Sequence, residues 1–147
     1  MSEIRIFQTT RRIIRGNGSL ATLNDEIARL GKSQVMIITD PGIVKAGILA
    51  KVEETLQAGN ISFSVFSDVE PDPQLKTALN AKNALIEKKA DMVIGIGGGS
   101  AIDIAKVASV LATNACDIGD LVGIDQVKSK GLPTIIIPTT AGTGSEV

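Results

Sequence analysis

Two short stretches of the sequence have residue types and spacings suited to holding a ligand. The first, IGIGGGSAID, spans residues 94–103 and follows an apolar run. The second, PTTAGTGSEV, spans residues 138–147 and alternates hydroxyl side chains with glycines. Glycine leaves the backbone open to close approach, and hydroxyl groups donate hydrogen bonds. Both stretches therefore predict a ligand that comes within hydrogen-bonding distance of the main chain.

The glycine run lies where an apolar strand is expected to give way to a helix. Gly97, Gly98 and Gly99 follow the strand, and Ser100 is expected to open the helix. Backbone N–H groups and the positive end of the helix dipole would then face one small volume, which favours a phosphate. Ser100 would donate to a phosphate oxygen or cap the helix, with Asp103 at a spacing like that of a capping box. The alternative is a tight turn and a capped helix without a ligand.

Two common phosphate-binding motifs do not match this run. A P-loop needs a Lys directly after its last glycine, whereas Lys106 lies within the expected helix. The ordinary dinucleotide fingerprint places an acidic residue about 20 residues after the glycines, on the ribose. The best acidic candidate here, Asp40, precedes the glycines at the end of another apolar run. The sequence therefore predicts nucleotide binding with a different topology.

The second stretch follows an apolar run and has the composition of a binding loop. Gly142 and Gly144 keep its backbone accessible. Its hydroxyl groups belong to Thr139, Thr140, Thr143 and Ser145. The alternative is a polar turn, because the same residue types are common in ordinary turns.

The composition excludes several classes of function. The chain has 147 residues and no histidine, which excludes a self-contained His-based metal site, a Ser-His-Asp triad and a Cys-His pair. A net charge of −1 and an aromatic content of 2% argue against nucleic acid as a partner. The sequence shows no signal peptide and no stretch apolar enough to span a membrane, and the single Cys116 cannot form an internal disulfide. We therefore expect a cytoplasmic protein without a membrane partner.

Apolar runs and helical patterns alternate along the chain. The runs that predict strands are QVMIITD (34–40), ISFSVF (61–66), DMVIGIG (91–97) and LPTIIIP (132–138). All but ISFSVF are continuously apolar, which predicts burial on both faces of the sheet. The helical patterns are SLATLNDEIARLG (19–31), GILAKVEETLQAG (47–59), DPQLKTALNAKNALIEKKA (72–90) and SAIDIAKVASVLATN (100–114). Ser19 is the expected N-cap of the first helix, while Gly31 and Gly59 are expected to end the first and second.

This order predicts a single α/β domain over residues 1–147 with a doubly wound, mainly parallel sheet. Ligands of such sheets bind outside the carboxyl ends of the strands. Both stretches follow a predicted strand, so we expect them at that edge.

GGGSAIDIAK and PTTAGTGSEV together resemble the two N-terminal signatures of the iron-containing (group III) alcohol dehydrogenases, a family related to glycerol dehydrogenase and dehydroquinate synthase. The resemblance extends along the chain, because GNGSLATL, the run ending in ITD, and VEPDPQLKTA occur in the family's order. It implies a Rossmann-like N-terminal nucleotide-binding domain, followed by a helical domain that holds a divalent metal. The TTAGTGSEV string favours the alcohol dehydrogenases over the two related enzymes.

The resemblance implies that NAD lies along both stretches. The residues that it assigns to the cofactor are Asp40, Pro71, Asp72, Gly97, Gly98, Gly99, Ser100, Asp103, Thr139, Thr140, Thr143 and Ser145. The glycines and Ser100 would hold the pyrophosphate, and the hydroxyl residues would line the adenosine and nicotinamide-ribose side. Asp40 would face the adenosine ribose and repel a 2′-phosphate. Asp103 and Lys106 would either reach toward the nicotinamide or form an i,i+3 pair on the helix.

The resemblance also implies what the sequence does not contain. The family's metal, iron with zinc as the alternative, is held by an Asp and three His residues of the helical domain. We therefore expect no catalytic and no metal-binding residue in this chain, which would be an inactive piece of a longer protein. The full-length parent would transfer hydride between a small alcohol or aldehyde and NAD, and would form a homodimer or a higher homo-oligomer. The alternatives are a stand-alone nucleotide-binding module and a domain of a glycerol dehydrogenase or dehydroquinate synthase type of enzyme.

Overall fold

The computed structural model describes residues 10–123 and 125–147. Within these residues, the sheet has four parallel strands in the order β2-β1-β3-β4. The strands are β1 (Gln34–Ile38), β2 (Ser62–Phe66), β3 (Met92–Gly97) and β4 (Thr134–Pro138), each within the run that predicted it. The chain moves from β1 outward to β2 and then returns to the other side of β1 for β3. The strand order therefore reverses between β1 and β3.

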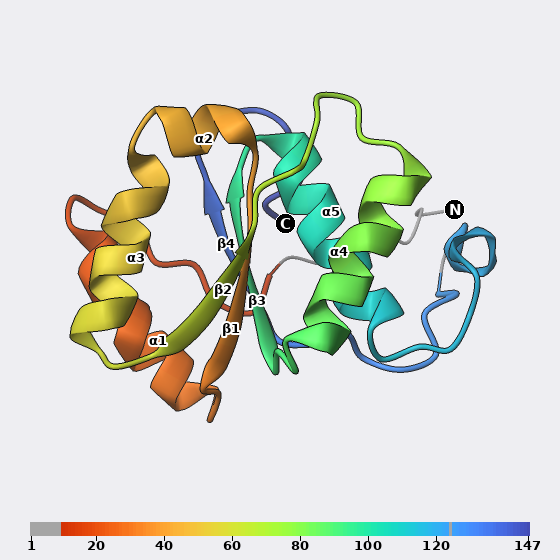
Figure 1. Cartoon of the computed structure of the whole chain (residues 1–147), viewed down its shortest axis with the longest axis horizontal. Helices are drawn as coiled ribbons and strands as arrows, with labels where there is room; N and C mark the ends of the chain where they lie inside the picture. Colours follow the sequence, from red (N-terminus) through yellow and green to blue (C-terminus); the bar gives the residue numbers. More distant parts are fainter. Residues whose placement is uncertain (1–9, 124) are drawn as a thin grey trace, which may run out of the picture.

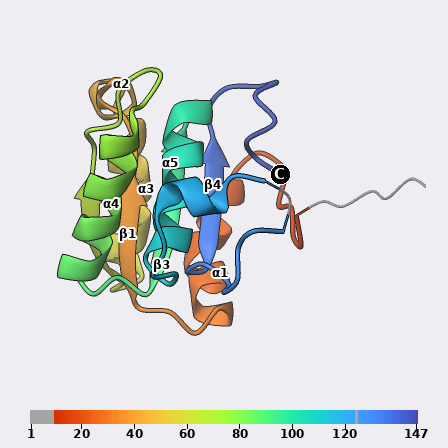
Figure 2. The same ribbon diagram turned by 90° about the vertical axis from the view of Figure 1, so that its right-hand side faces the viewer.

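Helices cover both faces of this sheet (Figure 1). One face carries η1 (Ser19–Thr22), α1 (Leu23–Arg29), α2 (Pro41–Lys45) and α3 (Ile48–Ala58). The other face carries α4 (Leu75–Glu87) and α5 (Gly99–Leu111), and η2 (Ile118–Leu121) follows α5 in the chain. In the turned view of Figure 2, the face of the sheet that carries α4 and α5 is directed toward the viewer, with α1 and α3 behind the sheet. The predicted doubly wound α/β fold is confirmed.

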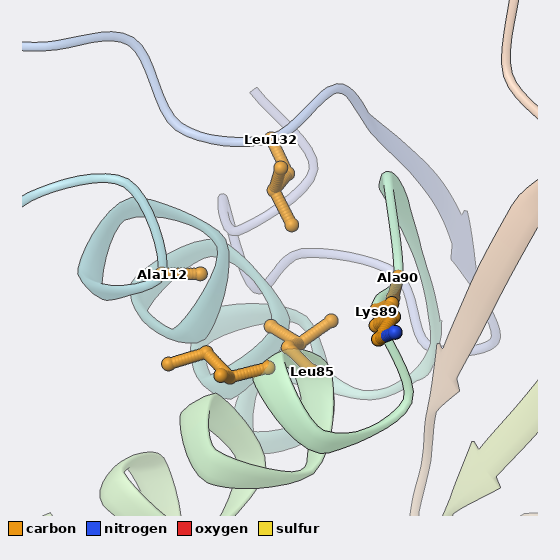
Figure 3. A pocket seen from close by; sticks show the side chains of 6 residues that line it. Leu85, Lys89, Ala90, Ala112 and Leu132 are labelled. Carbon is orange, nitrogen blue, oxygen red and sulfur yellow. The ribbon is translucent and has the colours of Figure 1, made fainter.

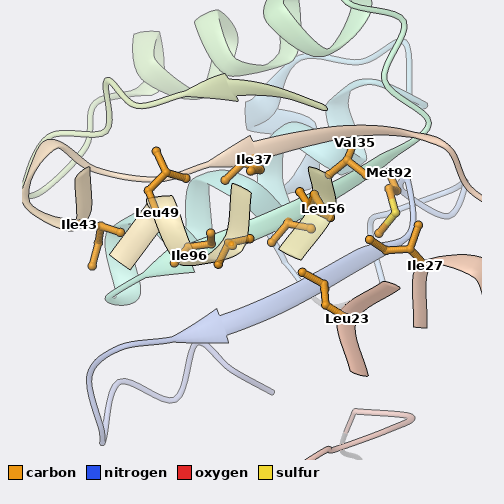
Figure 4. Packing of buried hydrophobic residues seen from close by; sticks show 11 residues of the cluster. Leu23, Ile27, Val35, Ile37, Ile43, Leu49, Leu56, Met92 and Ile96 are labelled. Atoms are coloured by element: carbon orange, nitrogen blue, oxygen red, sulfur yellow. The ribbon is translucent and has the colours of Figure 1, made fainter. Parts of the chain in front are cut away.

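The core consists of two clusters, one on each face of the sheet. Figure 4 shows the first, in which Val35 and Ile37 of β1 and Ile96 of β3 meet side chains from α1 and α3. Successive side chains of a strand point to opposite faces, so Met36 and Val93 belong to the second cluster, against α4 and α5. Burial on both faces explains why the runs that form β1 and β3 are continuously apolar.

Gly95 allows α5 to pack closely against β3. A Cβ atom built on Gly95 would lie 2.8 Å from Cβ of Ala105 and 3.1 Å from Cδ1 of Ile136. Small residues on the buried side of α5, Ala101 and Ala108 among them, also shorten the approach. The close packing places the N-terminus of α5 directly beside the carboxyl end of β3.

The prediction that β4 is buried on both faces was wrong. Ile135, Ile136 and Ile137 are only partly buried, because among the described residues β4 forms an edge of the sheet with a strand neighbour on one side. A continuous apolar run does not distinguish a central strand from such an edge. Among the described residues, no helix has the length and hydropathy needed to cross a bilayer.

The predicted helix ends are correct at Gly31 and Gly59 and wrong at Ser19. Gly31 has a φ of 66° directly after the last turn of α1, and Gly59 is the C-cap of α3. Ser19 instead lies inside η1, whose N-cap is Gly18 in the left-handed region. The start of this helix therefore depends on the backbone conformation of Gly18 and not on a cap from the side chain of Ser19.

Candidate functional site

Asp40 and Gly97 meet where the strand order reverses, which is the place where open α/β sheets bind ligands. A Cβ atom built on Gly97 would lie 2.8 Å from Oδ2 of Asp40 and 2.9 Å from Cβ of Ala101. Gly97 also has a φ of 142°, a conformation that side chains disfavour. The structure thus brings together two predicted site residues from different strands, and only glycine fits at position 97.

The carboxylate of Asp40 is held in a fixed direction. Asp40 is the N-cap of α2, and its Oδ1 accepts a hydrogen bond of 3.0 Å from the backbone N–H of Ile43. Gly42 gives it room, because a Cβ atom there would lie 2.9 Å from Oδ1. Oδ2 is directed toward Gly97. The capping role of Asp40 was missed, although Asp followed by Pro41 is a typical start of a helix.

Helix α5 begins one residue earlier than predicted. Its N-cap is Gly98 and its first residue is Gly99, so Ser100 does not open it. The N-terminus has no side-chain capping bond and no acidic residue in its first turn, so the capping arrangement considered for Ser100 and Asp103 does not form. The backbone N–H groups of the first turn therefore face the edge of the sheet without a side-chain acceptor, as an anion site requires.

The second stretch lies over the beginning of α5. A Cβ atom built on Gly98 would lie 3.3 Å from Oγ1 of Thr140, and one on Gly99 would lie 3.3 Å from Oγ of Ser145. The N–H of Thr139 donates to the carbonyl of Gly97 over 2.9 Å. The two stretches that the sequence singled out therefore form one surface, with hydroxyl groups opposite the glycines.

Thr143 shapes this loop from within. Its Oγ1 donates to Oε2 of Glu146 over 2.9 Å and accepts from the N–H of Ser145 over 3.2 Å. Hydrogen bonds from the backbone of Glu146 and from Thr143 hold the pKa of the Glu146 carboxyl below its usual value. The hydroxyl of Thr143 is thus engaged inside the loop, whereas Thr140 and Ser145 face the glycines.

Asp103 and Lys106 do not pair with each other. Asp103 is exposed, and Nζ of Lys106 donates instead to the backbone oxygen of Val147 over 2.7 Å. Figure 1 shows the end of the chain beside α5, in agreement with this contact. The alternative that Asp103 and Lys106 form an i,i+3 pair was therefore wrong. The hydrogen bond from Lys106 to the second stretch was not predicted.

Pro71 and Asp72 lie in the exposed loop between β2 and α4, at the same edge of the sheet (Figure 1). Glu70 stabilises this loop, since its carboxylate accepts from Oγ1 of Thr77 over 2.6 Å and from the N–H of Gln74 over 3.1 Å. The bond from Thr77 is the main cause that lowers the pKa of Glu70. The atoms nearest to Cβ positions built on the glycine run belong to Asp40, Ile43, Ala101 and the second stretch, and none of them belongs to this loop.

A hollow of about 160 Å³ lies at the opposite edge of the sheet (Figure 3). Its lining residues are Leu85, Ile86, Lys89, Ala90, Ala112 and Leu132. The lining is apolar apart from Lys89 and contains none of the predicted site residues. The candidate site is therefore the glycine edge and not this hollow.

Comparison with known sequences agrees with the geometry. A family described as iron-containing alcohol dehydrogenase matches residues 10–147. The chain is 45% identical over 135 residues to Long-chain-alcohol dehydrogenase 1 of Geobacillus thermodenitrificans, covering 90% of this chain and 34% of that protein. It is 37% identical over 142 residues to Sulfoacetaldehyde reductase of Bilophila wadsworthia, covering 97% and 37%. The chain thus spans about a third of the length of these relatives.

The fold of this chain also occurs in solved structures. NADH-dependent butanol dehydrogenase A from Thermotoga maritima superposes with a TM-score of 0.87 at 30% identity, covering 97% of this chain and 36% of that one. Sulfoacetaldehyde reductase from Bifidobacterium kashiwanohense in complex with NAD+ superposes with a TM-score of 0.76 at 30% identity, covering 90% and 35%.

Proposed function

We propose, from the premise that the chain belongs to the iron-containing alcohol dehydrogenase family, that it forms the NAD-binding domain of an enzyme that transfers hydride between a small alcohol and NAD. The observation that carries the proposal is the meeting of three elements at one edge. Asp40, the glycine run and the second stretch all lie there, around the N-terminus of α5. A relative whose solved structure contains NAD+ supports the choice of cofactor.

The pyrophosphate of NAD fits the N-terminus of α5. Gly98 and Gly99 have no side chains, which favours the approach of phosphate oxygens to the backbone N–H groups of the first turn. The hydroxyls of Thr140 and Ser145, opposite these glycines, would donate to the same oxygens. Ser100, in the first turn, would add a further donor. The nicotinamide supplies the hydride acceptor when NAD is bound.

The adenosine ribose fits beside Asp40. One carboxylate oxygen is bound to the N–H of Ile43, and the other would accept from the ribose hydroxyls. A 2′-phosphate at the same place would be repelled by the negative charge. The proposal also keeps five predicted residues as part of the surface around the cofactor. They are Thr139, Thr143, Pro71, Asp72 and Asp103.

The metal does not fit this chain. The sequence contains no histidine, and the described residues contain no group of three or more His, Cys, Asp or Glu side chains that could hold a metal ion. We therefore place the metal, iron or zinc, and the activation of the alcohol outside residues 1–147. The role of this chain is to bind and orient the cofactor.

Preference for NAD over NADP tests the function. Hydrogen bonds to a charged acceptor contribute about 1.5 to 3 kcal/mol, so we expect NAD+ to bind at least about tenfold more tightly than NADP+. Asp40→Asn should narrow this difference, because it removes the charge and keeps the oxygen that caps α2. Isothermal titration calorimetry at equal ionic strength measures both dissociation constants.

A matched control distinguishes the effect of the charge at Asp40 from the effect of removing any carboxylate from the chain. Asp91 also accepts backbone N–H bonds, from Ser33 and Gln34, but it precedes β3 at the opposite edge of the sheet. Asp91→Asn should leave the preference unchanged. Equal or tighter binding of NADP+ by the unmodified chain would overturn the assignment of Asp40 to the ribose.

A further inference from the structure

Thr39, the middle residue of ITD, had no role of its own in the sequence analysis. It connects the end of β1, which Asp40 follows, with β3, which contains Gly97. Its side chain is fully buried, and Oγ1 donates to the backbone carbonyl of Ile96 over 2.9 Å. Its backbone N–H donates over 2.9 Å to the carbonyl of Phe66 at the end of β2. Thr39 thus ties together the carboxyl ends of three neighbouring strands, β2, β1 and β3.

The hydrogen bond of Thr39 lies directly before the contact between Asp40 and Gly97. Thr39 precedes Asp40, and Ile96 precedes Gly97. The registered pairs of β1 and β3 end at Ile38 and Gly95, so the hydroxyl extends the link between the two strands beyond the ladder. This additional link lies between the end of β1 and the start of α2, next to Asp40. It can therefore influence the position of the Asp40 carboxylate.

The space for this carboxylate is narrow. Oδ1 is bound to the N–H of Ile43, and Oδ2 lies so close to Gly97 that a Cβ atom there would be only 2.8 Å away. A small shift of β1 against β3 would therefore move the carboxylate relative to any ribose beside it. A buried hydroxyl bound to a buried carbonyl resists such a shift, because breaking the bond leaves both groups unpaired away from water.

We propose that Thr39 is a positioning residue for cofactor discrimination, which holds the Asp40 carboxylate at the distance where it accepts from the ribose of NAD and repels a 2′-phosphate. The inference rests on the proposed function. It goes beyond it because Thr39 does not touch the cofactor and acts only through Asp40. The glycine run and the second stretch bind the pyrophosphate, which NAD and NADP share, so Thr39 affects mainly the ratio of the two affinities.

Substitution of Thr39 in the full chain tests the inference. In Thr39→Val, which keeps the shape and removes the hydroxyl, we expect the ratio of the NADP+ to the NAD+ dissociation constant to fall by at least about threefold, a change of about 0.7 kcal/mol. Thr39→Ser restores the donor and should keep the ratio within about twofold of the unmodified chain. Ser109→Ala is the control, because Ser109 is also a buried hydroxyl bound to a backbone carbonyl, that of Lys106. Its ratio should not change.

The outcomes distinguish this inference from the proposed function. If Thr39→Val weakens both cofactors equally, or lowers only the melting temperature, Thr39 is structural and the inference is overturned, while the assignment of Asp40 stands. If the unmodified chain shows no preference for NAD+, the assignment of Asp40 fails and the inference fails with it. If Thr39→Val does not fold, Thr39→Cys replaces it in the test, because a thiol donates only weakly. The inference then requires that the ratio of the NADP+ to the NAD+ dissociation constant be lower in Thr39→Cys than in Thr39→Ser.

Discussion

Replacing Gly97 with alanine is expected to lower the free energy of unfolding by about 3 kcal/mol, since overpacking and an unfavourable φ each cost roughly 1 to 3 kcal/mol. The added Cβ atom would lie 2.8 Å from Oδ2 of Asp40 and 2.9 Å from Cβ of Ala101, and the φ of 142° suits only glycine. For a chain of this size, the loss corresponds to a fall in melting temperature of roughly 6 to 12 °C. Differential scanning calorimetry measures it. NAD+ binding should weaken in the same variant, because Asp40 has to move.

Gly16 provides a close control for this variant. Its φ of 144° nearly equals that of Gly97, but no heavy atom of the described residues would lie within 4 Å of a Cβ atom there. Gly16→Ala therefore carries the conformational cost without the steric one. If Gly16→Ala and Gly97→Ala destabilise the chain equally, the close approach of Asp40 to Gly97 does not constrain this position.

Replacing Gly98 with valine is expected to weaken NAD+ binding by at least about tenfold, equivalent to about 1.4 kcal/mol, with little change in stability. Gly98 has a φ of −83°, which any residue adopts, so the backbone tolerates a side chain. The Cβ atom would lie 3.3 Å from Oγ1 of Thr140, so Thr140 would have to shift slightly, and the branched side chain would stand between the two stretches. The phosphates are proposed to lie at this place. Titration calorimetry of the folded variant measures the affinity.

Gly119 in η2 is the control for valine at a glycine position. No atom of the described residues would lie within 4 Å of a Cβ atom at Gly119, and no predicted site residue lies in η2. Gly119→Val should bind NAD+ as the unmodified chain does. A folded Gly98→Val variant with normal affinity would place the pyrophosphate elsewhere.

The sequence predicted the strands well because burial leaves a simple pattern. Strands β1 and β3 are covered on both faces, so nearly every residue in them is apolar. Edge strand β4 has the same apolar pattern but is less buried. The residue types of the run Thr134–Pro138 do not indicate how many strands lie beside it. The starting residue of α5 was off by one position, since a glycine N-cap has no side chain to mark it.

The sequence predicted that the two stretches lie at the same edge, but not the individual contacts between distant residues, because these depend on the order of the strands. The meeting of Asp40 with Gly97 requires β1 beside β3, which neither local sequence shows. The bond of Lys106 to Val147 is of the same kind. Buried Asn114 also holds the loop after α5, exchanging hydrogen bonds with the backbone of Ser129 in both directions, although a single Asn in a polar stretch gives no signal.

The central claim is that NAD binds over the N-terminus of α5, between the glycine run and the second stretch. The most direct test is a ¹⁵N–¹H correlation spectrum of the labelled chain during titration with NAD+, because glycine amides give well-separated signals. We predict saturable shifts at the amides of residues 97–100 and 139–145 and at Ile43, whose N–H is bound to Asp40. Shifts confined to the hollow around Leu85, Ala112 and Leu132, or no shifts at saturating NAD+, would contradict the account.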